Sequence, residues 1–148
     1  MKFRLVDQII EFSRGTSIET RKVVSFEESS LLTTWGRRGS FPETLLLQFA
    51  VESSSLLIAF TTEFKEICVL KEILSCRFLG RTKPGDQLRG QIQVTGFEGI
   101  NRTCNFQIYT EQDVISNGTF IVETTPIHCC FDPEEYALMW REMCDQTS

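Results

Sequence analysis

Two carboxylates and one amide fall on an apolar segment whose composition is typical of a buried helix. Glu43 opens this segment, Gln48 follows it, and Glu52 lies four residues beyond Gln48. Since residues four apart share one face of a helix, Gln48 and Glu52 are expected to be neighbours. Either glutamate has the chemistry of a general base on water or of a nucleophile, whereas an amide does not titrate near neutral pH. The segment therefore holds candidate acid/base groups with an amide between them.

The residues before this segment carry a recognisable pattern. They read Thr34-Trp35-Gly36-Arg37-Arg38-Gly39-Ser40-Phe41-Pro42-Glu43. Laid without a gap on Thr34 to Gln48, the pattern H-F-P-G-x-P-x-x-P-G-x-x-x-x-E of the β-hydroxyacyl-acyl carrier protein dehydratases resembles this stretch. Pro42 falls on one of its prolines and Trp35 on its aromatic residue. Thr34 falls on the catalytic His and Gln48 on the catalytic Glu or Asp, so the resemblance implies that both catalytic positions are substituted.

Two further segments are similar to the same family in the same order. Leu5-Val6-Asp7-Gln8-Ile9-Ile10-Glu11 is similar to its opening L-V-D-R-I-x-E, and Arg77-Phe78 with Pro84-Gly85-Asp86-Gln87-Leu88 is similar to K-F-x-x-x-V-x-P-G-D-x-L. The resemblance covers roughly residues 3–125. It implies an α+β hot dog fold, in which an antiparallel β-sheet wraps one long central helix.

The family activity is dehydration of (3R)-hydroxyacyl-acyl carrier protein in fatty-acid or polyketide metabolism, which needs a base for the α-proton and an acid for the departing hydroxyl. Each such group is worth about a hundredfold to ten-thousandfold in rate. Thr34 and Gln48 supply neither. We therefore expect a homologue that binds an acyl thioester or its carrier and has little or no dehydratase activity by itself.

Glu43 is a third departure, because it takes the place of the family's glycine, whose backbone N–H is thought to hold the thioester carbonyl. Its charge either opposes an enolate-like oxygen at this position or points into solvent as a first-turn acid.

Three alternatives stay open. The first is a hot dog thioesterase that uses Glu43 or Glu52 as its carboxylate. The second is a non-enzymatic partner subunit of an active dehydratase, and the third is a structural protein with a filled tunnel.

The resemblance also implies an acyl tunnel between helix and sheet at a dimer interface. Its expected substrate-binding residues are Trp35, Glu43, Leu45, Leu46, Phe49, Phe78 and Leu79, although core packing explains the apolar ones equally well. An acidic carrier protein, or the phosphopantetheine arm that the substrate brings, would need positive charge at the tunnel mouth. The candidates are Arg37, Arg38, Arg77, Arg81 and Lys83. The alternative is that these residues lie on solvated loops and bind no carrier. No other cofactor is expected, and the dimer is either a homodimer or a heterodimer with an active paralogue.

Size and composition agree with one domain, 1–148, made of a core over 1–131 and a C-terminal helix over 132–144. The formal net charge of −5 argues against nucleic-acid binding. Glu52 and the serines after it interrupt the longest apolar run, and the first residues lack the features of a signal peptide, so a cytoplasmic protein without a membrane span is expected.

The six cysteines form no C-x-x-C pair and accompany a single histidine, His128, so buried reduced thiols are favoured over a metal site. His128 itself is expected to be a structural residue on the last strand.

Hydrophobic periodicity predicts the elements that position these groups. Strands are expected at 4–12, 17–26, 66–79, 87–97, 102–111 and 118–128, with a helical turn at 27–32 and a hairpin turn at Ser116-Asn117-Gly118. The helix from Pro42 to about Thr61 is expected to be buried on all sides. Asp132-Pro133-Glu134-Glu135 is a strong helix start, and it is followed by an apolar stripe of Tyr136, Met139, Trp140 and Met143.

Overall fold

The structure is a computed structural model that describes residues 5–25 and 43–145. The expected helical turn at 27–32 lies outside the described residues, as do Thr34, Trp35, Arg37 and Arg38. The described elements are β1 (Gln8–Ser13), β2 (Ser17–Val23), α2 (Glu43–Thr61), β3 (Glu66–Phe78), β4 (Gln87–Glu98), β5 (Asn101–Tyr109), β6 (Val114–Pro126), η2 (Ile127–Cys129) and α3 (Pro133–Asp145).

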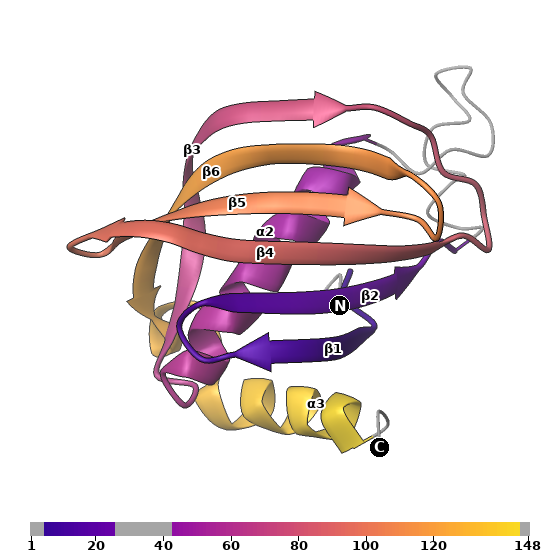
Figure 1. Cartoon of the computed structure of the whole chain (residues 1–148). Coiled ribbons are helices and arrows are strands. Elements are labelled where there is room, and N and C mark those ends of the chain that lie inside the picture. Colours follow the sequence, from indigo (N-terminus) through magenta and orange to yellow (C-terminus); the bar gives the residue numbers. More distant parts are fainter. Residues whose placement is uncertain (1–4, 26–42, 146–148) are drawn as a thin grey trace.

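One sheet holds all six of these strands, in the order β1-β2-β4-β5-β6-β3 with every pairing antiparallel. The sheet curves around α2, which crosses behind it (Figure 1). This arrangement confirms the predicted hot dog fold. β2 and β3, which precede and follow α2 in the sequence, do not pair, and β3 forms one edge of the sheet.

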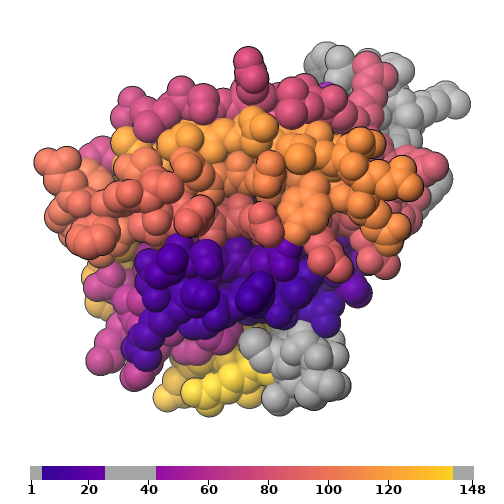
Figure 2. All heavy atoms as spheres, viewed as in Figure 1, coloured from indigo at the N-terminus to yellow at the C-terminus, as the bar shows by residue number. Residues whose placement is uncertain are grey.

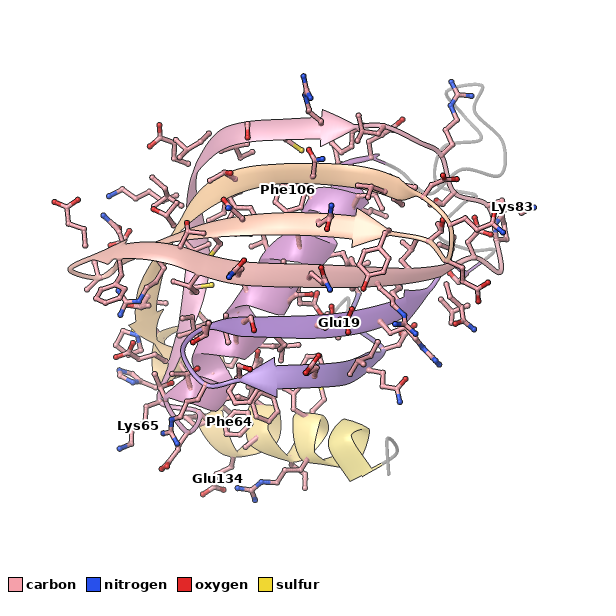
Figure 3. All side chains as sticks on the ribbon, in the orientation of Figure 1. Glu19, Phe64, Lys65, Lys83, Phe106 and Glu134 are labelled. Carbon is pink, nitrogen blue, oxygen red and sulfur yellow. The ribbon has the colours of Figure 1, made fainter. Side chains whose placement is uncertain are left out.

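Alternation of side chains explains why the sheet has a dry face toward α2. In β4, Leu88 and Ile92 are buried while Gln91 is exposed, and in β5 Phe106 and Ile108 are buried on the same face. The outer face carries Gln, Asn and charged side chains over several strands (Figure 3). The period of two was therefore a reliable signal for which face covers the helix.

Gly90 lets α2 approach the sheet closely. A Cβ atom at this position would lie 2.8 Å from Cε1 of Phe49, whose side chain is fully buried on α2. Beside this contact, the hydroxyl of Ser53 donates to the carbonyl of Phe49 at 2.8 Å and lies 2.7 Å from the hydroxyl of Thr20. The one proton of Ser53 is used by the carbonyl, so Thr20 donates to Ser53 and both buried hydroxyls are satisfied.

The sequence predicted that α2 is buried on all sides, and this prediction is wrong. Gln48 is exposed, and Val51, Glu52 and Ser55 are only partly buried, so one side of the helix remains open. By length and composition α2 is apolar enough to cross a membrane, and half of the apolar window is buried inside the protein.

The predicted hairpin turn at Ser116-Asn117-Gly118 is wrong, because these residues lie within β6. The connection between β5 and β6 instead turns after Thr110, whose backbone N–H donates to the carbonyl of Asp113 at 2.9 Å. Gly118 serves packing rather than a turn. A Cβ atom there would lie 2.2 Å from the carbonyl oxygen of Ser75 on β3 and 2.8 Å from the ring of Phe106.

The predicted C-terminal helix is confirmed, and α3 lies below β1 in the view of Figures 1 and 2. Asp132 caps it, with Oδ1 accepting from the backbone N–H of Glu134 at 2.9 Å. Aromatic rings join α3 to the short segment that follows α2. The ring centroids of Phe64 and Tyr136 are 6.1 Å apart, and those of Tyr136 and Trp140 are 6.2 Å apart (Phe64 is labelled in Figure 3).

Candidate functional site

The open side of α2 faces a mainly apolar pocket of about 440 Å³ between α2, β3 and the C-terminal segment. Gln48 and Glu52 both line it, as their spacing on one helix face predicts. The volume lies within the range of about 300–1,000 Å³ that is usual for small-molecule sites. The other lining residues are Val51, Ser55, Ile67, Cys68, Val69, Leu70, Cys130, Phe131, Tyr136, Met139 and Trp140.

The carboxylate of Glu52 is held by the backbone of the N-terminal segment. The N–H of Leu5 donates to Oε1 at 3.1 Å and lies 3.2 Å from Oε2, and the N–H of Val6 donates to Oε1 at 3.2 Å. Leu5 and Val6 are fully buried, so Glu52 gives their amides an acceptor at a place that solvent does not reach. These bonds fix the carboxylate in place at the edge of the pocket and commit its oxygens to a structural task.

Burial keeps two further groups that line the pocket, Cys68 and Tyr136, in their neutral forms. Burial raises the pKa of the Cys68 thiol from 9.0 to about 11, although hydrogen bonds with Ser54 and Ser55 oppose the change. Burial also raises the pKa of Tyr136 well above its ordinary value, the hydrogen bond with Ser55 opposes this, and the charge of Glu52 adds to it. Near neutral pH both groups are protonated, so neither is a general base.

The structure places the expected tunnel residues in two other environments. Leu46 and Phe49 are core residues beneath the sheet, and Leu45 packs against that core. Phe78 and Leu79 are exposed at and after the end of β3, and neither they nor Leu45 belong to the lining of the pocket beside Gln48. Glu43 is partly buried at the first position of α2.

The expected carrier-binding residues that are described lie on and after the end of β3. Arg77, Arg81 and Lys83 are all exposed. Arg81 and Lys83 share a hollow of about 660 Å³ with Leu79, which is also bordered by the acidic side chains of Asp86 and Asp113. Lys83 lies at the opposite end of the sheet from Phe64 and the start of α3 (Figure 3).

His128 is on the 3-10 helix η2 and is exposed, whereas the sequence placed it on the last strand. β6 ends one residue before η2, at Pro126. His128 is the one imidazole of the chain and does not line the pocket beside Gln48, although its neighbour Cys130 does.

Sequence reasoning missed the wall that α3 contributes to this pocket. Helical spacing places Tyr136, Met139 and Trp140 on one stripe, but the spacing does not show which surface this stripe covers. One signal could have revealed this wall. Gln48 and Glu52 make one face of the otherwise apolar α2 polar, which indicates that the sheet does not cover this face and that another element can lie beside it.

A helix wrapped by this sheet, with a pocket beside the helix, defines a hot dog protein. The fluoroacetyl-CoA thioesterase FlK has a similar structure, with a TM-score of 0.68 and 14% sequence identity over 90% of this chain and 98% of that one. At this identity the likeness supports the fold alone.

Sequence comparison identifies the family within this fold. No protein-family model matches the chain. The chain is 30% identical over 109 residues to the 3-hydroxyacyl-acyl-carrier-protein dehydratase FabZ of Bacillus cytotoxicus, and the match covers 66% of this chain and 68% of that protein. It is 29% identical over 98 residues to the FabZ of Oceanobacillus iheyensis, and this match covers 66% of this chain and 70% of that protein. The chain belongs to the FabZ dehydratase family.

Proposed function

We propose that this protein binds acyl thioesters in the pocket between α2, β3 and α3, and that it has little or no dehydratase activity by itself. The observation that carries the proposal is the position of Gln48, which lines an apolar pocket where the family motif has its catalytic carboxylate. The amide offers a donor and an acceptor to a thioester or hydroxyl but exchanges no proton with it near neutral pH.

The remaining groups of the pocket support the same proposal. Glu52 is engaged by two backbone amides, and Tyr136 and Cys68 are neutral at physiological pH. Because Thr34 and Gln48 stand in place of the usual acid and base, two contributions to the dehydration rate are lost, each of about a hundredfold to ten-thousandfold. Binding does not depend on these contributions, because it comes from the apolar walls.

The test is hydration of a crotonyl-carrier thioester, the reverse of dehydration, by the purified protein. We expect turnover at the background rate for the wild type and for Gln48→Ala alike. Robust turnover that Gln48→Ala abolishes would defeat the proposal.

A thioesterase is the second candidate, favoured by the presence of a carboxylate in the pocket and by the thioesterase activity named for the structural neighbour FlK. In this reaction Glu43 or Glu52 acts as a base on water or as the nucleophile. Free thiol released from acyl-CoA is the readout. Glu52→Gln is the suitable variant, because its amide oxygen still accepts from the Leu5 and Val6 N–H groups. If the wild type releases no free thiol, or if Glu52→Gln and Glu43→Ala both release it like the wild type, a thioesterase that uses either carboxylate is eliminated.

The proposed partners are an acyl carrier protein or CoA that carries the thioester, and a second hot dog subunit. Exposed Arg77, Arg81 and Lys83 support an acidic carrier or its phosphopantetheine arm. The second subunit is either another copy of this chain or an active paralogue, whose own catalytic residues would supply the chemistry. Mixing with an active paralogue and assaying hydration by the complex distinguishes the two.

A further inference from the structure

The C-terminal helix supplies one whole wall of the pocket beside Gln48. Polar groups gather on the α2 side of this pocket, where Gln48 and Glu52 lie. Much of the apolar lining comes from Tyr136, Met139 and Trp140 of α3 together with Phe131 before it. A ligand whose thioester meets the polar groups therefore places its apolar part among these side chains.

The α3 wall is fixed in position by contacts outside the pocket. Tyr136 packs edge-on against Phe64, with centroids 6.1 Å apart, and the Trp140 side chain is 1% exposed. Asp132 caps the helix start through the N–H groups of Glu134 and Glu135, at 2.9 and 3.4 Å. Because the cap and the buried aromatic contacts hold α3 in place, we expect the helix not to shift to make room for a longer ligand.

Among the α3 residues that line the pocket, Met139 is the one that we expect to tolerate a larger or smaller side chain. Tyr136 and Trp140 are buried and build the contact between α3 and the body, whereas Met139 is partly buried and only packs against the core. An unbranched side chain at such a position fills space without fixing the fold. The preceding residue, Leu138, is 59% exposed and does not line the pocket.

We propose that α3 closes the distal end of the acyl site and that Met139 sets the longest acyl chain the protein accepts. This inference rests on the proposed function, because it assigns the apolar part of the same pocket to the acyl chain. It adds a specificity-determining residue on an element outside the motifs that carry the family resemblance.

The test measures binding of S-alkyl-CoA thioethers to the full chain by calorimetry, from S-butyl-CoA through S-hexyl-, S-octyl- and S-decyl- to S-dodecyl-CoA. A thioether cannot be hydrolysed as a thioester, so thioesterase activity does not disturb the readout. While each added methylene still enters the pocket, the affinity should rise by about fourfold, which corresponds to about 0.8 kcal/mol. Beyond the length at which the chain meets Met139, the affinity should stop rising.

The position of this limit in wild type and variants decides the proposal. Met139→Ala should move it to a longer chain and Met139→Phe to a shorter one, while Leu138→Ala should leave it unchanged. Opposite movements by two variants of one residue cannot come from a general loss of stability. If wild type binds the series but neither Met139 variant moves the limit, the inference is overturned and the proposed function stands. If no member of the series binds, both are overturned.

Discussion

At the scale of single residues, Glu52 is the polar link between the N-terminal segment and α2. Its oxygens accept from the N–H groups of Leu5 and Val6, both fully buried. Glu52→Ala leaves these amides without an acceptor and should lower the free energy of unfolding by about 1–3 kcal/mol, measured by urea denaturation. Glu52→Gln keeps one acceptor oxygen and should lose clearly less. Equal stability of wild type and Glu52→Ala would show that the link is dispensable.

Gly90 tests how closely α2 must approach the sheet. Its alanine variant would place a Cβ atom 2.8 Å from the ring of the buried Phe49, so the ring or the helix must shift. We expect Gly90→Ala to reduce the free energy of unfolding by about 1–3 kcal/mol, the usual cost of overpacking. Gly96→Ala on the same strand is the matched control, because in the described part of the chain no atom other than those of its own chain neighbours lies within 4 Å of its Cβ position. Loss of stability in both variants would point to strand propensity rather than to the contact with Phe49.

Cys68 makes stability depend on alkaline pH. Burial raises its pKa in the folded protein from 9.0 to about 11. Between these values the unfolded chain has lost the proton that the folded protein keeps, so this stabilisation is complete below pH 9 and is lost as pH rises toward 11. The loss is about 2–3 kcal/mol for Cys68. Urea titrations at several pH values should show a shallower decline for Cys68→Ala, and an unchanged slope would contradict the assignment.

At the scale of elements, β3 has the features of a subunit interface. It is an edge of the sheet over its 13 residues, and among the described strands only β6 pairs with it. Val69, Leu70, Ile73 and Leu74 on it are 40–53% exposed. A long apolar edge strand left open is a liability, and pairing it with the edge of a second subunit removes that liability.

Replacing Leu74 with lysine should therefore weaken self-association, because the charge must be desolvated in the interface. In sedimentation equilibrium we expect a dimeric wild type and a dimer dissociation constant at least about tenfold higher for Leu74→Lys. Phe97→Lys is the control, since Phe97 is 78% exposed at the far end of β4. A wild type that is monomeric throughout would show that a homodimer is not formed.

The elements differ in how far local sequence determined them. Alternation in β4 and β5 and the Asp-Pro start of α3 are local signals, and the structure confirms the elements they predicted. The sequence favours a turn at Gly118, but a turn and a close interstrand contact both favour glycine, and only the pairing with β3 decides between them. The pocket depends on α3 lying against α2 and β3, which no local pattern specifies. Gln48 and Glu52 were predicted as neighbours, but the N-terminal amides that occupy Glu52 were not.

Across the molecule, a FabZ-type hot dog fold has a pocket of about 440 Å³ beside its central helix, and this pocket is lined by Gln48, which we propose stands in place of a catalytic carboxylate. We propose that the protein holds a thioester without converting it. Equilibrium dialysis of the protein against crotonyl-CoA, with chemical analysis of the thioester recovered from the protein side, tests both parts of this proposal. We expect saturable binding and recovery of unchanged crotonyl-CoA. Recovery of 3-hydroxybutyryl-CoA or free CoA, or no binding at all, would contradict it.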